Sequence, residues 1–387
     1  MRTPAPHAAV PGALVLVVPA GVDDPASPSG GNTYDLRAAD ALRHAGRPVR
    51  LLAAPGTWPR PAPQDVAALA AALAALPDGA DVLLDGLVAC SAPDAVVPAA
   101  ARLHLTVLVH LPLADETGLP PDDAAQRHTA ESRTLAAAHA VVATSAATAA
   151  RLAARLGRPV HHAPPGVDPA PLTAGSPGGD RLLCVASITP RKGQDVLVGA
   201  LAALADRPWT CTLVGPDRGD PGYAAELRHR IADAGLAGRI TLAGPLTGAD
   251  LDARYADADL LALPSRAEPY GMVVTEALAR GLPVVASAVD GVPEALGAAP
   301  DGALPGVLVP PGDPAALAGA LRRWLDHPAH RAHLRATAAA RRAALAGWDA
   351  TTAALSTAVD RAAALAAAVD HAAAVPDRTA PAAGGAR

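Results

Sequence analysis

The sequence predicts an α/β protein built from two parallel sheets, each covered by helices on both faces. Twelve short apolar runs recur along the chain, and an alanine-rich helical stretch follows each of them. The runs are continuously apolar, which is typical of parallel strands buried on both sides. A segment rich in proline, glycine and serine at 168–180 separates six runs from the other six. With 387 residues, 51% of them hydrophobic, the chain is large enough for two cores.

Each predicted domain contains six strands. The strands of the first are 13–18, 48–53, 81–86, 105–110, 140–145 and 159–164. Those of the second are 181–186, 210–215, 239–244, 259–264, 283–288 and 306–311. We therefore predict a first Rossmann-like domain over 1–168, a linker over 169–179 and a second Rossmann-like domain over 180–345. Two facing domains of this kind leave a ligand cleft between the carboxyl edges of their sheets.

The end of the chain is predicted to form one long helix followed by a disordered tail. The helix, within 346–374, is expected to pack back towards the first domain, and residues 375–387 are expected to be disordered. Its predicted apolar stripe consists of Leu355, Val359, Ala362, Leu365 and Val369.

Composition and charge exclude several classes of protein. The net charge is −5 and no basic stripe is present, which argues against a nucleic-acid binder. Three widely spaced cysteines fit no metal or disulfide pattern, so we expect a reduced, cytoplasmic protein. The apolar run 12–21 is too short to cross a bilayer, and we predict no stable membrane span. Peripheral association with the inner membrane stays open.

A pair of glutamates marks the second domain. Glu268 and Glu276 are eight residues apart, and a helix is predicted to begin near Gly271. Glu268 then precedes the helix, and Glu276 projects from about its second turn. The free N–H groups of residues 271–274 would form an anion site between them. Two carboxylates beside such a site can accept hydrogen bonds from sugar hydroxyls. The alternative is that Glu268 caps the helix and Glu276 is solvated.

The chain contains a single lysine, Lys192, although 31 arginines are present. It follows the strand 181–186 and precedes a helix that begins near Gln194, so it is expected at the same edge of the sheet. Lysine presents a compact charge with three donors, whereas arginine presents a wide planar fork. A narrow pocket for a diphosphate would tolerate only the first. The alternative is the chance survival of one surface lysine.

Two features of the first domain are weaker when taken alone. The glycine pair at Gly30 and Gly31 follows the first strand and would let the backbone approach a phosphate closely, or would form an ordinary turn. His110 ends the strand 105–110, where it could hydrogen-bond a sugar hydroxyl or remain a satisfied core histidine.

Taken together, these motifs resemble the retaining glycosyltransferases of family four, which have the GT-B fold. The resemblance covers most of the chain and is dense from 181 to 326. Its most specific part is the E-x7-E motif within "PSRAEPYGMVVTEALARGLPVVAS", together with the "K-G" after the first strand of the second domain. The resemblance implies transfer of a sugar, with retention of configuration, from a UDP- or GDP-sugar to an acceptor hydroxyl. It implies no metal and no cofactor besides the nucleotide sugar.

The resemblance also implies roles for individual residues. The implied catalytic residues are Glu268, Lys192 and His110. The implied donor-binding residues are Gly31, Arg191, Lys192, Gly244, Leu246, Glu268, Tyr270, Gly271, Met272, Val273 and Glu276. This sequence has Ser187 where the family usually has an arginine, and Asp290-Gly291 where it has two glycines. Whether Arg191 replaces that arginine stays open, as do the acceptor, the donor and the oligomeric state.

Two other functions share the double Rossmann-like layout. One is a nucleotide-sugar epimerase or isomerase, which would need an acid and a base of its own. The other is a non-catalytic module that binds a sugar nucleotide. Incubation with UDP-glucose and GDP-mannose separates the three, because only transfer releases a nucleoside diphosphate and only isomerisation changes the sugar.

Overall fold

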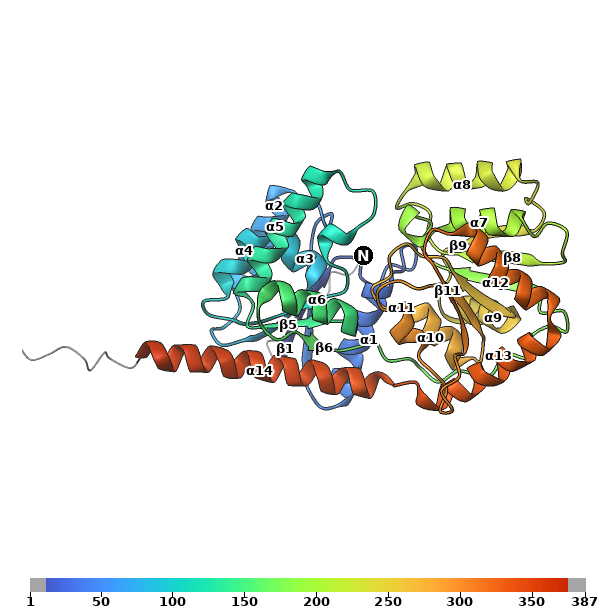
Figure 1. The fold of residues 1–387 in the computed structure, drawn as a ribbon. Coiled ribbons are helices and arrows are strands. Elements are labelled where there is room, and N and C mark those ends of the chain that lie inside the picture. The colour runs from blue at the N-terminus through green and yellow to red at the C-terminus, as the bar shows by residue number, and fades with distance from the viewer. Residues whose placement is uncertain (1–11, 375–387) are drawn as a thin grey trace, which may run out of the picture.

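The computed structural model describes residues 12–374 and contains two six-stranded parallel sheets, as the sequence predicts (Figure 1). The predicted disorder of 375–387 falls outside the described residues. The strands of the first sheet are β1 (Leu14–Pro19), β2 (Val49–Ala54), β3 (Asp81–Asp85), β4 (His104–Val109), β5 (Ala140–Ala143) and β6 (His161–His162). Its order is β2-β1-β3-β4-β5-β6.

Helices cover both faces of this sheet. They are α1 (Gly30–His44), α2 (Pro63–Ala74), α3 (Gly86–Ser91), α4 (Pro93–Ala99), α5 (Pro121–Ala137) and α6 (Ala146–Leu156). Both faces of β1 are buried, which explains why its sequence is continuously apolar. Val15 and Val17 face one core, and Leu14, Leu16 and Val18 face the other. A strand with cores on both faces has no solvent-facing side, so it needs no polar residue.

The second sheet has the order β12-β11-β10-β7-β8-β9. Its strands are β7 (Arg181–Val185), β8 (Thr210–Val214), β9 (Ile240–Gly244), β10 (Leu260–Leu263), β11 (Val284–Ser287) and β12 (Gly306–Val309). Its helices are α7 (Gln194–Ala202), α8 (Pro221–Asp233), α9 (Gly248–Asp257), α10 (Met272–Ala279), α11 (Val292–Leu296), α12 (Pro314–Asp326) and α13 (Pro328–Arg341). All twelve predicted strands are confirmed to within one or two residues at most ends, although β6 is shorter than predicted.

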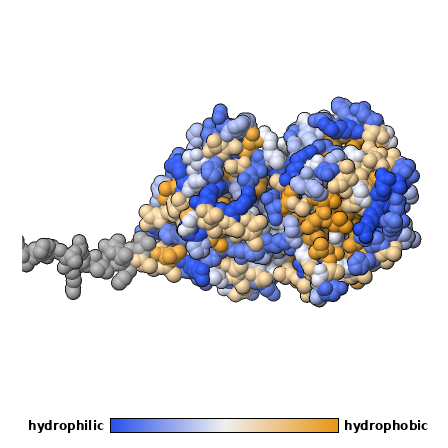
Figure 2. Space-filling view, in the orientation of Figure 1, coloured by the Kyte–Doolittle hydropathy of each residue, from blue (hydrophilic) through white to orange (hydrophobic). Residues whose placement is uncertain are grey.

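The carboxyl edges of the two sheets face each other. Glu116, in the loop beyond β4, accepts a hydrogen bond of 3.1 Å from Nε of Arg191, which follows β7. Glu294 of α11 accepts a 2.7 Å bond from the Ala146 amide at the start of α6 and lies 2.8 Å from Nε2 of His162. The two domains form two lobes, and the molecular surface narrows where they meet (Figure 2).

The last helix, α14 (Trp348–Ala374), crosses from the second domain and lies along the first (Figure 1). Leu355, Val359 and Ala362 are buried against α1 and the first sheet, as the stripe predicts. Leu365 was wrongly predicted to belong to that stripe, since it is 53% exposed and Ala366 takes the buried position. Position 366 lies 11 residues after 355, just over three full helical turns, whereas 365 is rotated by about 80° to one side. Among residues 12–374, no helix combines the length and the hydropathy needed to span a bilayer.

We expect Leu355→Ala to destabilise the protein by about 2–5 kcal/mol, because it removes a fully buried side chain from the core shared by α14 and the first sheet. Leu365→Ala is the matched control on the same helix and should change the free energy of unfolding by less than about 0.5 kcal/mol. Urea unfolding of both variants measures the difference. Equal losses would mean that α14 does not pack as described.

Candidate active site

The predicted site residues of the second domain lie where the order of its strands reverses. β7 and β10 are neighbours in the sheet, although the chain builds β8 and β9 between them. Lys192 ends the 3₁₀ turn Pro190–Lys192 after β7, and Glu268 lies in the loop after β10. Ligands of such sheets bind outside the carboxyl ends of strands at this reversal point.

Lys192 and Glu268 form a buried ion pair. The Lys192 ammonium donates to Oε2 of Glu268, and the hydroxyl of Ser265 donates to the same oxygen at 3.1 Å. The two charged side chains are only 13% and 9% exposed. Burial alone would raise the pKa of Glu268, but the charges of Lys192 and Arg191 outweigh burial and hold it below its usual value. The carboxyl group is therefore ionised at neutral pH. Burial lowers the pKa of the Lys192 ammonium, and the charge of Glu268 opposes this.

The glycine after Lys192 brings the two strands' loops into contact. Gly193 has φ +67°, and a Cβ at this position would lie 2.2 Å from the carbonyl oxygen of Pro264. No other residue fits this close approach. Because the turn is pressed against the end of β10, the lysine side chain reaches Glu268.

The start of α10 differs in one detail from the predicted anion site. Gly271 has φ +95° and caps the helix, but the amide of Val274 donates to the Gly271 carbonyl at 2.8 Å. The prediction of four free N–H groups at 271–274 is therefore wrong for Val274, because the first turn closes on itself. The predicted donors that remain are the amides of Gly271, Met272 and Val273.

Asp290, one of the departures from the family pattern, supports the loop that contains Glu268. Its Oδ2 accepts a 3.0 Å bond from the backbone amide of Glu268, and the Gly291 amide donates to the Glu268 carbonyl at 3.2 Å. Asp290 adopts φ +41°, the one positive value outside glycine among residues 12–374. The aspartate thus fixes the backbone on both sides of Glu268, which the sequence did not indicate.

Glu276 lies on the second turn of α10, as predicted. It is partly buried and accepts a 2.8 Å hydrogen bond from the Tyr255 hydroxyl. Burial raises the pKa of Glu276, and the bond from Tyr255 and the charge of Arg280 partly oppose this. The guanidinium of Arg280 stacks 4.5 Å from the centre of the Tyr255 ring. The carboxyl group is therefore held in position by neighbours and is not a loosely solvated side chain.

The remaining predicted residues of the second domain lie around this centre. Arg191 bonds to Glu116 of the first domain and, through Nη1, to the Ala267 carbonyl at 3.3 Å. Gly244 ends β9 and accepts from the Gly215 amide at 2.9 Å. Leu246 and Tyr270 are partly buried against the same apolar core. The structure does not test the roles assigned to these residues, which stay predictions.

The first domain presents Gly31 and His110 together. Gly30 and Gly31 are the first residues of α1, so the alternative of an ordinary turn is wrong. A Cβ on Gly31 would lie 3.3 Å from Cδ2 of His110, so the absence of a side chain here leaves room for the imidazole ring. A Cβ on the neighbouring Gly30 would lie 3.7 Å from Sδ of Met272, the first residue of α10. The glycine pair therefore lies beside His110 in its own domain and beside the predicted anion site of the other.

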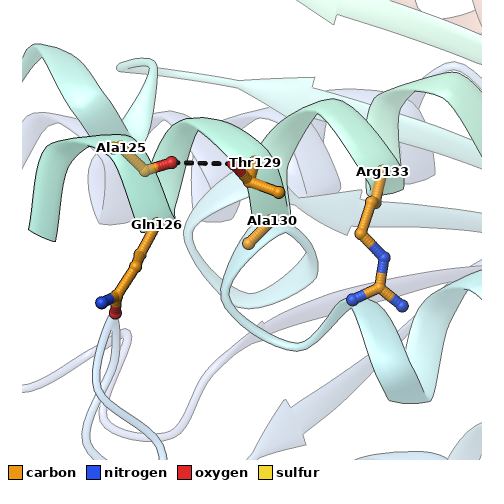
Figure 3. Close-up of a pocket in the computed structure, with 5 residues that line it drawn as sticks. All are labelled: Ala125, Gln126, Thr129, Ala130 and Arg133. Atoms are coloured by element: carbon orange, nitrogen blue, oxygen red, sulfur yellow. Dashed lines mark hydrogen bonds between the residues drawn. The ribbon is translucent and has the colours of Figure 1, made fainter. Parts of the chain in front are cut away.

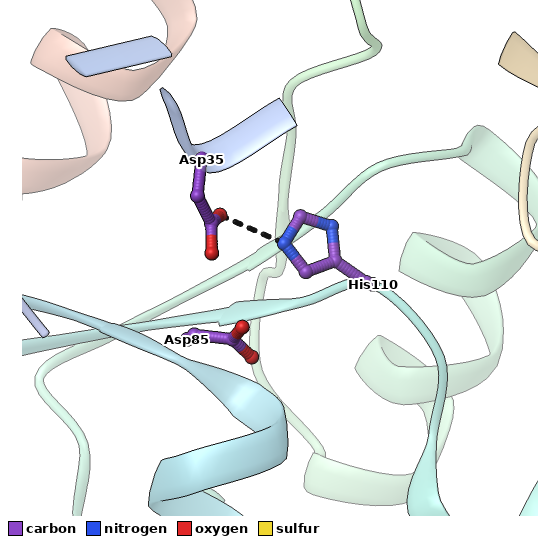
Figure 4. A group of neighbouring side chains, drawn as sticks. All are labelled: Asp35, Asp85 and His110. Carbon is purple, nitrogen blue, oxygen red and sulfur yellow. Dashed lines mark hydrogen bonds and ion pairs between the residues drawn. The ribbon is translucent and has the colours of Figure 1, made fainter. Parts of the chain in front are cut away.

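Two acidic residues that the sequence reading missed lie beside His110. Nε2 of His110 is 2.9 Å from Oδ1 of Asp35, and the carboxyl group of Asp85 faces both (Figure 4). Asp85 is the last residue of β3. His110 was chosen because it lies at the carboxyl end of its strand, and the same criterion would have selected Asp85. Asp35 lies within α1 and gives no comparable signal.

Burial dominates the electrostatics of this cluster. It raises the pKa of Asp35 to about 7 and that of Asp85 to about 8. Burial also lowers the pKa of His110, against the opposing charge of Asp85. The cluster therefore holds a neutral imidazole beside two carboxyl groups that are not both ionised at neutral pH.

The size of a surface hollow does not locate the site. A hollow of about 340 Å³ lies on α5 and is lined by Ala125, Gln126, Thr129, Ala130 and Arg133 (Figure 3). It is open to solvent, contains one charged side chain and includes no predicted site residue. The converging polar groups at the facing sheet edges are the better indicator.

Two Rossmann-like domains with facing carboxyl edges define the GT-B fold, and solved structures agree. Sucrose-phosphate synthase from Thermosynechococcus elongatus superposes with a TM-score of 0.70 at 23% identity, covering 89% of this chain and 97% of that one. Anabaena Alr3699/HepE in complex with UDP and glucose gives a TM-score of 0.66 at 20% identity, covering 90% and 99%. The fold predicted from the sequence is confirmed.

Sequence comparison identifies the second domain more closely. Residues 175–341 match the family model described as glycosyl transferases group 1. The D-inositol 3-phosphate glycosyltransferase of Kineococcus radiotolerans is 37% identical over 214 residues, 49% of each chain. D-inositol 3-phosphate glycosyltransferase 1 of Catenulispora acidiphila is 34% identical over 296 residues, 68% of this chain and 65% of the relative. The chain thus spans about half the length of the first relative and about two thirds of the second.

Removing the ammonium of the buried pair should cost stability. We expect Lys192→Met to destabilise the protein by about 3–5 kcal/mol at pH 7, because Glu268 is left ionised and unpaired inside the protein. In the wild type, the contribution of Glu268 is present above its usual pKa and is lost as the pH falls through its lowered value. The difference between wild type and variant should therefore shrink below about pH 4.

The double variant Lys192→Met, Glu268→Gln is the control, since it removes both charges at once. It should recover most of the lost stability in chemical denaturation at pH 7. Additive losses from the two changes would contradict a direct pair.

Proposed function

We propose that the protein is a retaining glycosyltransferase that moves a hexosyl group from a nucleoside-diphosphate sugar to an acceptor hydroxyl. The observation that supports this most directly is the buried Lys192–Glu268 pair immediately before the start of α10. A buried ammonium beside the N-terminus of a helix is an arrangement that binds a diphosphate. The match of residues 175–341 to the glycosyl transferases group 1 model supports the same assignment.

The proposed roles are those that the family resemblance implies, and the contacts described above are compatible with them. Lys192 and the amides of Gly271, Met272 and Val273 bind the diphosphate and stabilise the negative charge that develops as it leaves. Glu268 orients the ammonium and presents its carboxylate to hydroxyls of the donor sugar. His110 lies on the opposite side of the sugar. Glu276, held by Tyr255, accepts hydrogen bonds from the ribose.

In the proposed reaction, the bond from the anomeric carbon to the diphosphate breaks and the acceptor oxygen attacks from the same face. The leaving diphosphate takes the proton of the acceptor hydroxyl, so no protein nucleophile is needed. We propose that no metal takes part and that the protein contributes positioning and charge stabilisation. The cross-domain bonds of Glu294 and Arg191 would hold the two domains close and restrict access of water to the donor.

The donor is proposed to be a UDP-sugar. One solved structure with this fold contains UDP and glucose, and another of the same protein contains UDP-glucose. Relatives that are 33–40% identical are described as D-inositol 3-phosphate glycosyltransferases, which makes a phosphorylated cyclic polyol one acceptor to test.

The structure contains no membrane-spanning helix over 12–374. We propose a cytoplasmic location.

Incubation with UDP-glucose or GDP-mannose tests the reaction class. We expect slow release of UDP from UDP-glucose, accelerated by the correct acceptor, with an α-linked product seen by NMR. A changed sugar without release of UDP would support an epimerase, and binding without reaction would support a non-catalytic module. A β-linked product would contradict retention.

Lys192→Arg should weaken the binding of both UDP and inorganic pyrophosphate about tenfold, because the wide guanidinium does not fit the site of the buried ammonium. Calorimetry with each ligand measures the loss. Arg230→Lys, an exposed exchange on α8, is the matched control and should leave both affinities unchanged. Unchanged affinity in the Lys192 variant would exclude it from the diphosphate site.

Glu276→Gln should separate the ribose from the diphosphate. We expect its affinity for UDP to fall about five- to tenfold while its affinity for pyrophosphate is retained, because only UDP has a ribose. The Lys192 variant should lose both. Equal losses for the two ligands in the Glu276 variant would contradict the ribose assignment.

A further inference from the structure

The cluster of Asp35, Asp85 and His110 is built from three separate parts of the first domain. Asp35 lies on α1, Asp85 ends β3, and His110 follows β4. One ligand atom of each lies within 4.8 Å of the others. The side chain of Asp35 is 0% exposed and that of His110 is 18% exposed. Two buried carboxyl groups without a lysine or arginine beside them are costly, so their presence needs a physical explanation.

One oxygen of Asp35 indicates how the two carboxyl groups coexist. Its Oδ1 lies 2.9 Å from Nε2 of His110, but its Oδ2 is buried and has no hydrogen-bond donor within residues 12–374. That second oxygen points towards the carboxyl group of Asp85 (Figure 4). Two ionised carboxylates can only accept, so a bond between them requires one proton. Either carboxyl group could supply that proton, since burial raises the pKa of Asp35 to about 7 and that of Asp85 to about 8.

This shared proton determines the state of the imidazole ring. With the proton between Oδ2 of Asp35 and the carboxyl group of Asp85, Oδ1 of Asp35 carries no hydrogen, so Nε2 of His110 must donate to it. Nδ1 is on the side of the ring away from Asp35 (Figure 4). It has no protein partner among the hydrogen bonds of the described chain. A neutral ring that donates through Nε2 offers an acceptor lone pair at Nδ1.

We infer that Asp35 and Asp85 are positioning residues that share one proton and hold His110 in its Nε2–H form, leaving Nδ1 to accept a hydrogen bond from a hydroxyl of the bound sugar. The catalytic part of this inference rests on the proposed function, whereas the state of the cluster does not. Gly31 leaves room for the ring in the orientation that Asp35 sets, because a Cβ at position 31 would lie only 3.3 Å from Cδ2.

Other titratable groups around the cluster do not change charge in the relevant range. The Tyr34 ring contacts the His110 ring edge-on with centroids 5.1 Å apart, and burial raises the pKa of its hydroxyl well above the usual value. Cys90 on α3 lies near Asp85, and burial likewise raises the pKa of its thiol. Near neutral pH, the groups of the cluster that change charge are therefore the carboxyl groups of Asp35 and Asp85, whose pKa values are raised to about 7 and about 8.

The form of the ring can be observed directly. Nitrogen-15 NMR of the full chain, with the His110 signals assigned from His110→Gln, should show a neutral ring protonated at Nε2 at pH 7. Asp35→Ala should abolish this preference, whereas Asp40→Asn, an exposed acid on the same helix, should leave it unchanged. A ring protonated at Nδ1 or at both nitrogens in the wild type would overturn the inference.

Stability against pH tests the shared proton without reference to activity. Burial gives Asp85 a higher pKa in the folded protein than in the unfolded chain, so its contribution to stability is full below about pH 4 and is lost as the pH rises to about 8. Asp85→Asn supplies a permanent N–H donor to Asp35 and removes this dependence. The urea midpoint of the variant relative to wild type should therefore rise between pH 5 and pH 8. A constant difference, as expected for Asp40→Asn, would overturn the inference.

A metal ion is the rival occupant of this cluster. Elemental analysis of the purified chain and unfolding with EDTA or added Zn²⁺ or Mn²⁺ decide between them. We expect no stoichiometric metal and no change in the midpoint. One equivalent of bound metal, with an EDTA effect that Asp85→Asn abolishes, would overturn the shared-proton inference.

Kinetics then connect the cluster to the reaction. Asp35→Ala should lower kcat about tenfold with a change of less than about threefold in the donor KM, as expected for an acceptor aimed at a hydroxyl of the reacting sugar. If the wild type transfers no sugar from any donor, the proposed function fails, while the NMR and stability results still decide the cluster. If the wild type is active and Asp35→Ala retains its kcat, only the positioning role fails.

Discussion

The buried ion pair between Lys192 and Glu268 is the interaction on which the site of the second domain depends. It joins the turn after β7 to the loop after β10, the two strands between which the order of the sheet reverses. Each partner alone would be a costly buried charge, so the pair exists only because the neighbouring backbone brings both side chains together. Gly193 allows that approach from one side, and Asp290 fixes the Glu268 backbone from the other.

The buried pair explains why position 192 is a lysine, although the chain otherwise uses arginine. The ammonium occupies a space bounded by Glu268 and by the loop contacting Pro264, and it is 13% exposed. A guanidinium is larger, planar and rigid, and it could not keep the same contact without moving the loop. Arg191, one residue earlier, is turned instead towards Glu116 of the other domain. The two adjacent cations therefore have different tasks, one within the site and one between the domains.

The fold was largely predictable from the sequence, whereas the finer parts of the site were not. Strands buried on both faces leave a strong local signal, as in β1, so their positions could be read directly. It is harder to predict from the sequence which side of a helix is buried. Leu365 was placed on the buried stripe from its spacing, yet packing of α14 selected Ala366. Lys192, Glu268 and Glu276 could be selected as candidate site residues because each belongs to a short local motif at the end of a strand.

Contacts between distant segments gave no such signal. Asp35 and Asp85 are separated by 50 residues, and only the folded chain places them beside His110. Glu294 joins the domains through α6 and His162, far away in sequence. The facing edges of the two sheets therefore stabilise their buried carboxyl groups in different ways. The second domain balances a buried carboxylate with an ammonium, which keeps it ionised, and the inferred arrangement of the first balances one with a shared proton. Under the proposed function, a diphosphate would meet positive charge on one side of the gap and neutral, hydrogen-bonding groups on the other, which would orient the donor before any acceptor arrives.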